Sequence, residues 1–243
     1  MIYVMSDIHG NKERFESVMK QIDLHPEDTL YVLGDVVDRN PYGIEILQTI
    51  MKMPNAKMLL GNHEYMMLNV LAGADCDDGD WKHSYWHDMR RLWFENGGRT
   101  TYQSIRLLTK EEIEEIKAYL KALPVNIDIE VNGQKYKLVH ATDKNDFQES
   151  GLHDWYDNEI EYAVWKRWKP DEPTPTDYIM VCGHTPTIHY QEDNPLKIWH
   201  GNNMIDIDCG AGFPKDQGLS KIHLYGRLSC LRLDDMKEFY SEE

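Results

Sequence analysis

The sequence predicts an α/β fold for this chain of 243 residues. In its first third, short apolar runs alternate with segments of helical periodicity. Three of these runs end in polar clusters, in which Asp35 follows Asp7 by 28 residues and Asn62 follows Asp35 by 27. This interval suits successive strand–helix–strand units. Because open α/β sheets bind ligands beyond the carboxyl ends of their strands, we expect the clusters to meet at one edge.

The first third predicts three strands and three helices. The strands are Ile2–Met5, 29–33 and 57–60. The first helix is Lys12–Ile22, because Phe15, Val18, Met19 and Ile22 recur at helical spacing. The second begins at Pro41, a residue that suits the first helical position, and the third begins at Asn62.

Residues 72–108 interrupt this alternation. Four aspartates crowd a predicted loop, at positions 75, 77, 78 and 80, and Asn96-Gly97-Gly98 comes later. We predict an insertion with a small helical cap, in which Trp81, Trp86 and Trp93 mainly supply packing, although some could line a substrate groove. Residues 109–123 then form an amphipathic helix pattern with Thr109 as a candidate cap.

The second half of the chain changes to strand patterns. Runs 127–131 and 135–139 flank Asn132-Gly133, which indicates a hairpin. Further strands are predicted at 178–182, 204–207, 221–224 and 230–233. Since no repeat or Pro/Gly/Ser-rich linker divides the sequence, we predict a single domain over residues 1–243.

Composition excludes several classes of function. With 26 Lys and Arg against 42 Asp and Glu, the net charge of −16 disfavours nucleic acid as a partner. No apolar run approaches the roughly 20 residues of a membrane span, so no membrane partner is expected. The four cysteines form no CxxC pair and are interpreted as reduced, and the first residues lack the basic start of a signal peptide. We therefore expect a cytoplasmic protein.

Two further strand ends carry His140 and His184. With the earlier clusters they complete a set of oxygen and imidazole donors: Asp7, His9, Asp35, Asn62, His140 and His184. Such a mixed set suits Mn²⁺, Fe²⁺ or Zn²⁺, and the lack of a thiolate cluster argues against structural zinc. Six donors exceed the needs of one ion, whereas two ions about 4 Å apart, bridged by a carboxylate, account for them. Individually, Asp7 or Asn62 could cap a helix and His140 could be structural; the conjunction of five strand ends favours a metal site.

The motifs SDIHG, GDVVDRN and GNHE, followed by His140 and His184, resemble those of the calcineurin-like metallophosphoesterases. Within that superfamily they are most similar to the phosphoprotein phosphatases, including bacterial and phage serine/threonine phosphatases. Asp208-Cys209-Gly210-Ala211 resembles the family's late strand and turn. Ser6 and Asn40 stand where glycine is usual, and neither change removes a ligand. The resemblance implies a four-layer α/β/β/α sandwich with two packed mixed sheets.

The resemblance also implies roles for single residues. Asp7, His9 and Asp35 would hold a first metal ion, and Asp35, Asn62, His140 and His184 a second, with Mn²⁺ expected and iron or zinc as alternatives. A hydroxide bridging both ions would attack phosphorus directly. His63 would protonate the leaving group, with Asp38 orienting its ring. Arg39 and Arg167 would bind phosphate, although Arg167 is also compatible with a surface cation.

The function implied is metal-dependent hydrolysis of phosphoserine and phosphothreonine in proteins. Symmetrical diadenosine tetraphosphate hydrolases share the same motifs, so this activity is the alternative. The expected partner is accordingly a phosphoprotein or a phosphorylated small molecule. A metal-binding module without catalysis is a third hypothesis, which the intact Asp38, Arg39 and His63 argue against.

Overall fold

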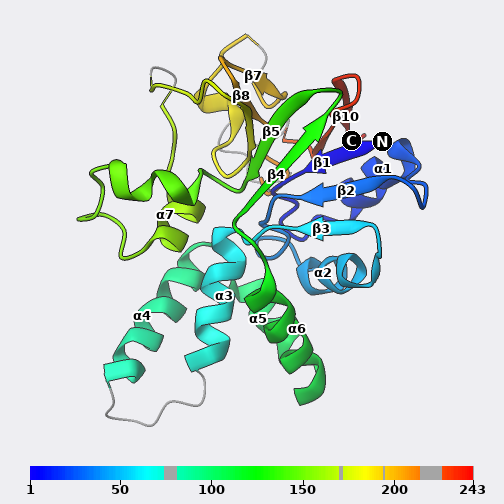
Figure 1. The fold of residues 1–243 in the computed structure, drawn as a ribbon. Helices are drawn as coiled ribbons and strands as arrows, with labels where there is room; N and C mark the ends of the chain where they lie inside the picture. The colour runs from blue at the N-terminus through cyan, green and yellow to red at the C-terminus, as the bar shows by residue number, and fades with distance from the viewer. Residues whose placement is uncertain (74–80, 170–171, 194, 214–225, 243) are drawn as a thin grey trace.

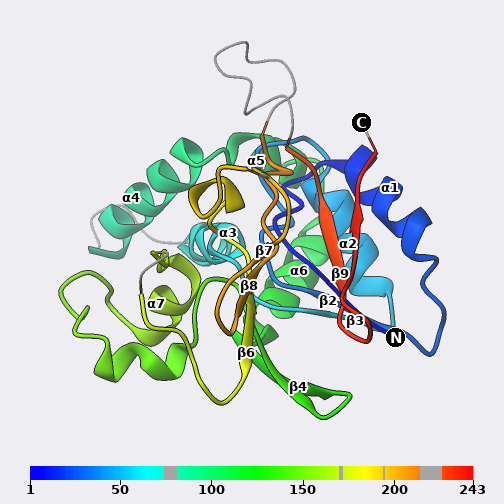
Figure 2. The ribbon, with the colours of Figure 1, turned by 90° about the horizontal axis from the view of Figure 1, so that it is seen from above.

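Two five-stranded sheets form the centre of the protein in a computed structural model (Figures 1 and 2). The structure describes residues 1–73, 81–169, 172–193, 195–213 and 226–242, with the backbone alone at 81–86. Within these residues, no helix is both long enough and apolar enough to cross a bilayer.

The first sheet has the strand order β10-β9-β1-β2-β3. Its parallel strands are β1 (Ile2–Met5), β2 (Thr29–Val32) and β3 (Ala56–Met58). The antiparallel strands β9 (Ser229–Arg232) and β10 (Lys237–Tyr240) complete it, with Val4 opposite both Tyr31 and Leu231. The chain therefore returns from its far end to lie beside its first strand.

Helices cover the outer face of this sheet. α1 (Lys12–Ile22) and α2 (Gly43–Lys52) make the crossovers between its parallel strands. Side chains alternate as period 2 requires: Met5 and Val32 pack with helix residues, whereas Val4 and Leu33 pack toward the second sheet. The sheet is thus buried on both faces, as expected for parallel strands joined by helices.

The second sheet has the order β4-β5-β6-β8-β7. Its strands are β4 (Asn126–Val131), β5 (Gln134–Val139), β6 (Ile179–Cys182), β7 (Trp199–His200) and β8 (Met204–Asp206). Leu138, Val181 and Ile205 share a buried cluster with Val4 and Leu33. This cluster is the layer between the sheets.

The remaining helices gather beside the sheets (Figure 1). They are α3 (Asn62–Gly73), α4 (Trp81–Glu95), α5 (Arg99–Ile105), α6 (Lys110–Ala122) and α7 (Glu159–Trp165), with 3₁₀ turns at Lys144–Glu149 and Thr187–His189. Thr109 caps α6 through a reciprocal capping box with Glu112. α3 packs against both α4 and α6, which places the helix beginning at Asn62 between them.

The predicted α/β class with two mixed sheets is confirmed. α2 begins at Gly43 rather than Pro41, because the left-handed residues Asp38 and Arg39 and the turn after them delay the helix. The short strands β7 and β10 and helix α7 were not predicted. The predicted strand 221–224 and the aspartate loop at 75–80 lie outside the described residues.

Candidate active site

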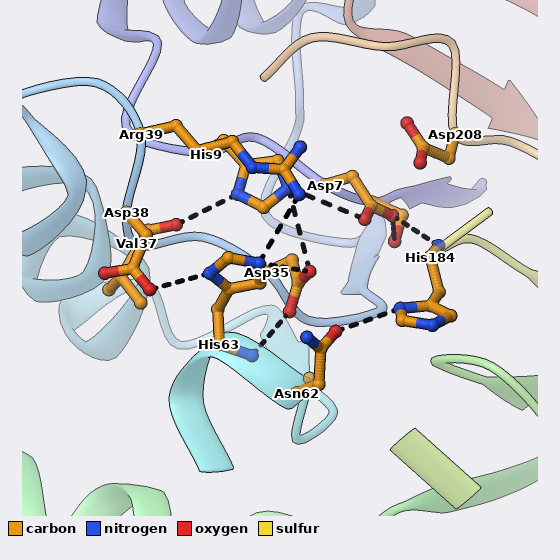
Figure 3. Close-up of polar contacts among 12 residues, drawn as sticks. Asp7, His9, Asp35, Val37, Asp38, Arg39, Asn62, His63, His184 and Asp208 are labelled. Atoms are coloured by element: carbon orange, nitrogen blue, oxygen red, sulfur yellow. Dashed lines mark hydrogen bonds and ion pairs between the residues drawn. The ribbon is translucent and has the colours of Figure 1, made fainter. Parts of the chain in front are cut away.

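The polar clusters that follow β1, β2, β3, β5 and β6 meet at one edge of the two sheets. Figure 3 shows residues from the clusters after β1, β2, β3 and β6. Candidate ligand atoms of His9, Asp35 and His63 lie within 4.8 Å of one another, and so do those of Asp35, His140 and His184. Asp35 is common to both groups. Sequence reasoning placed Asp7, not His63, with His9; in the structure Asp7 Oδ1 lies 3.9 Å from His9 Nε2.

The backbone at this edge is strained. Eleven described non-glycine residues have positive φ, and six of them belong to the predicted site: Asp7, His9, Asp35, Asp38, Arg39 and His184. A left-handed conformation in a non-glycine residue costs on the order of 1–3 kcal/mol and persists only where its surroundings hold it. The side chains at these turns are therefore fixed by tertiary contacts rather than by local preference.

Glu64 supplies one of these contacts. Its buried carboxylate accepts hydrogen bonds from the backbone N–H groups of Asp35 (2.7 Å), Val36 (2.8 Å), Val37 (3.2 Å) and Gly61 (3.2 Å). Burial raises the pKa of Glu64, against the effect of the amides. Sequence reasoning gave Glu64 no role, although its place within GNHE, in the first turn of α3, is a signal that could have found it.

The two residues that depart from glycine also bond within the site. Ser6 Oγ donates to Asp7 Oδ2 at 2.5 Å, and the backbone N–H of His184 donates to the same oxygen at 3.0 Å. Asn40 Nδ2 donates to the carbonyl of His9 at 2.9 Å. The Asn40 side chain therefore ties two turns together, whereas Ser6 orients the adjacent Asp7 carboxylate that also accepts from His184.

Three histidines are held by backbone carbonyls. His9 Nδ1 lies 3.1 Å from Val37 O, His140 Nδ1 lies 2.7 Å from Leu33 O, and His184 Nε2 lies 3.2 Å from Trp165 O. Because a carbonyl only accepts, each of these nitrogens carries the hydrogen and the other ring nitrogen presents a lone pair. Burial lowers the pKa of all three imidazoles, which favours this neutral form.

These lone pairs face oxygen atoms. Asn62 Oδ1 lies 3.0 Å from His140 Nε2 and 2.9 Å from His184 Nδ1. Asp35 Oδ2 lies 3.7 Å from His9 Nε2. Burial raises the pKa of Asp35 well above its usual range, and burial together with the charge of Asp7 raises the pKa of Asp208 to about 8. The histidine lone pairs, the Asn62 amide oxygen and the buried carboxylates are all hydrogen-bond acceptors that lie close to one another. Such a group of acceptors fits the binding of divalent cations.

His63 has a different partner. Its Nδ1 lies 2.6 Å from Asp38 Oδ2, and its Nε2 lies 3.7 Å from Asp35 Oδ2 and 3.5 Å from Arg39 Nη2 (Figure 3). Both His63 and Asp38 are buried. The Asp38 carboxylate at one ring nitrogen fixes the orientation of the ring, while the other nitrogen points at the shared edge.

The two predicted phosphate-binding arginines flank the same edge. Arg167 Nη1 donates to His184 O at 3.2 Å and to Thr185 Oγ1 at 3.3 Å. Arg39 and Arg167 are exposed and line a cavity of about 540 Å³, together with Lys169, His184 and His189. No aspartate or glutamate is among the described residues that line this cavity. In a chain of net charge −16, such a lining favours an anionic ligand.

Comparison with known proteins gives the family. A family model described as calcineurin-like phosphoesterase matches residues 1–210. Serine/threonine-protein phosphatase 2 of Salmonella typhimurium is 28% identical over 167 residues, which cover 68% of this chain and 67% of that protein. A symmetrical bis(5'-nucleosyl)-tetraphosphatase of Yersinia enterocolitica is 36% identical over 73 residues, 29% of this chain and 25% of that protein. The same-named protein of Baumannia cicadellinicola is 29% identical over 142 residues, 57% of this chain and 41% of that protein.

Solved structures share the fold. A metallophosphoesterase from Sphaerobacter thermophilus has a TM-score of 0.55 at 17% identity, covering 99% of this chain and 87% of the other. A cold-active protein-tyrosine phosphatase from a Shewanella species has a TM-score of 0.52 at 15% identity, covering 99% and 80%. The family match over most of the sequence, on a fold that carries these donor groups, shows that the chain belongs to the calcineurin-like phosphoesterase family.

Proposed function

We propose that this chain is a metal-dependent phosphomonoesterase that hydrolyses phosphoserine and phosphothreonine in proteins. The observation that carries the proposal is the His63–Asp38 pair, bonded at 2.6 Å, with the second nitrogen of His63 beside both the donor groups and Arg39. A proton donor is needed because the alkoxide of serine or threonine is a poor leaving group. The similarity to the Salmonella protein, over two thirds of both chains, supports the same substrate class.

The donor groups would hold two divalent cations. Asp7, His9 and Asp35 would bind one, and Asp35, Asn62, His140 and His184 the other, with manganese as the expected metal. When bound, such cations supply the Lewis acidity that activates water and neutralises phosphoryl oxygens. Backbone carbonyls bind one ring nitrogen of each of the three histidines, so the other ring nitrogen is oriented toward the remaining metal-ligand groups. The proposed ligands are therefore already in place for the cations.

His63 would act as a proton donor and not as a ligand. Its partner is a carboxylate, whereas the proposed ligands His9, His140 and His184 bond backbone carbonyls. The Arg39 guanidinium beside its Nε2 also disfavours a cation there. In the reaction, Nε2–H would protonate the departing alkoxide while Asp38 keeps the ring in place.

Arg39 and Arg167 would bind the phosphoryl oxygens. Both are exposed to the cavity beside the donor groups, and each offers a planar fork that matches two oxygens of a phosphate. The bonds from Arg167 to His184 O and Thr185 Oγ1 fix its position relative to a proposed ligand. The arginines would therefore place the phosphorus atom between His63 and the donor groups.

A symmetrical dinucleoside tetraphosphate hydrolase is the second candidate. Besides the two arginines, the cavity is lined by Lys169, so the lining carries more positive charge than a single phosphoryl group needs. A polyphosphate chain would use that charge. The relatives named for this activity match over shorter stretches of this chain.

Product analysis tests the proposal. The purified chain with added Mn²⁺ is given phosphoserine, phosphothreonine and phosphotyrosine peptides and diadenosine tetraphosphate, with Asp35→Asn prepared in parallel to measure contaminating activity. We expect inorganic phosphate from the phosphoserine and phosphothreonine peptides. ADP formed from the dinucleotide, without phosphate from the peptides, would replace the proposal with the second candidate. A metal-loaded protein that is inactive on all four substrates would support a binding module.

A further inference from the structure

Trp93, at the end of α4, makes a hydrogen bond to the proposed catalytic pair. Its indole Nε1 donates to Asp38 Oδ2 at 2.8 Å, the same oxygen that lies 2.6 Å from His63 Nδ1. Both Trp93 and Asp38 are fully buried. We propose that Trp93 is a positioning residue of this site, one that acts on the leaving group only through Asp38 and His63. The inference rests on the proposed function, in which His63 is the proton donor.

The carboxylate of Asp38 depends on this bond. Among the described residues, Asp38 Oδ1 has no hydrogen-bond partner, so the indole and the imidazole are the two donors to the side chain. A buried carboxylate is stabilised by each donor it keeps, and its rotation is limited by their geometry. Without the indole N–H, only His63 would fix the oxygen that is meant to fix His63.

The backbone of the same segment holds Asp38 and Arg39. Thr101 Oγ1 accepts from the Asp38 N–H at 2.8 Å, and Gly97 O accepts from the Arg39 N–H at 3.1 Å. Asp38 and Arg39 have φ angles of 73° and 66°, so they need external support. Residues 93–101, which we call the α4–α5 corner, thus bond both the side chain and the backbone of this turn.

Two glycines allow the corner to approach. Gly97 has a φ of 100°, and a Cβ there would lie 3.0 Å from Arg39 Cγ. A Cβ on Gly98 would lie 2.4 Å from Trp93 Nε1, which leaves no room for any side chain against the indole. The predicted role of Trp93 as packing for a cap is therefore incomplete, because its polar atom reaches the site.

Leaving-group dependence tests the inference. Trp93→Phe keeps a buried aromatic ring and removes the N–H. If the indole positions a proton donor, kcat for a phosphoserine peptide should fall roughly 10- to 100-fold, the range for one hydrogen bond to a charged group. The loss should shrink to about 2-fold for 4-nitrophenyl phosphate, whose leaving group needs no proton. KM and metal content should stay unchanged.

A double-mutant cycle separates positioning from structural support. In a His63→Asn background, Trp93→Phe should cause no further loss on the phosphoserine peptide, because the group it acts through is absent. Phe94→Leu is the matched control: its ring contacts Trp93 and Tyr102, and it should affect both substrates equally. A full further loss in the His63→Asn background, or an equal loss on both substrates in Trp93→Phe, would overturn the inference.

Thr101→Val provides an independent variant if Trp93→Phe does not fold. It removes the acceptor for the Asp38 N–H at nearly constant shape. The inference requires that Thr101→Val, like Trp93→Phe, lose more kcat on the phosphoserine peptide than on 4-nitrophenyl phosphate. An equal loss on both substrates would show that the corner is structural support only. If His63→Asn itself loses activity equally on both substrates, the role proposed for His63 fails instead, so the two failures are distinguishable.

Discussion

Replacing Glu64 by glutamine tests whether one buried carboxylate holds the strand ends of the site together. Oε2 accepts from the N–H groups of Asp35 and Gly61, and Oε1 accepts from those of Val36 and Val37. Glutamine keeps one oxygen and turns an NH₂ group toward the other pair. Whichever way the amide is oriented, two buried backbone donors lose their acceptor.

The magnitude follows from this count. Each buried donor left without a partner costs about 1–3 kcal/mol, so Glu64→Gln should lower the free energy of unfolding by about 2–6 kcal/mol. In a protein of this size, 1 kcal/mol corresponds to roughly 2–4 °C, which predicts a fall in Tm of roughly 5–20 °C. Because Asp35 is one of the residues released, Mn²⁺ affinity should fall as well.

Urea unfolding and equilibrium dialysis of Mn²⁺ measure both effects. Glu115→Gln is the matched control, since Glu115 is an exposed residue of α6, and it should change neither quantity. A loss in Glu64→Gln below about 1 kcal/mol would mean that water or a relaxed backbone replaces the carboxylate, and Glu64 would then not be the group that holds these strand ends.

Four further outcomes are expected. His63→Asn should lower kcat for a phosphoserine peptide by roughly 10² to 10⁴ while keeping its metal, as elemental analysis would show. Asp35→Asn should lose metal, and a normal metal content would contradict the bridging assignment. In EDTA, Tm should fall as the pH rises from 6.5 to 8. Burial raises the pKa of Asp208 in the folded state to about 8, so the folded protein keeps a proton on Asp208 that the unfolded chain has already released. The stability that this proton provides at low pH is therefore lost as the pH rises. Asp208→Asn should flatten that slope, and a Tm that does not fall would exclude the raised pKa. Gly98→Ala should destabilise the protein by about 1–3 kcal/mol in urea, because its Cβ would overlap the Trp93 indole, and an unchanged midpoint would refute that contact.

The local sequence pattern was sufficient to predict elements whose apolar residues recur at a regular spacing. β1 and α1 have the bounds predicted from periodicity, and the hairpin at Asn132-Gly133 has the two positive φ angles that its residues favour. Elements without such a signal were missed. β7 has two residues, and α7 is a single short helix whose first turn is mostly polar.

The candidate site divides in the same way. Side chains at strand ends could be collected from sequence, because parallel strands bring their carboxyl ends to a common edge. Glu64 and Trp93 were not assigned. The GNHE motif marks Glu64, but its partners depend on tertiary structure, because it bonds backbone amides of a turn 27 to 29 residues away. Trp93 likewise reaches Asp38 across 55 residues. A sequence shows which side chains can do chemistry more readily than it shows which ones hold them.

The left-handed turns at the edge that carries the site limit the thermal stability that an active variant of this chain can reach. Glycine would relax each of those backbones, yet at Asp7, His9, Asp35, Asp38, Arg39 and His184 it would delete a side chain on which the proposed chemistry depends. An engineer who wants a more durable enzyme should therefore leave this rim untouched. Additional stability has to come from substitutions in distant helices and on sheet surfaces, where a change of sequence does not lower catalytic activity.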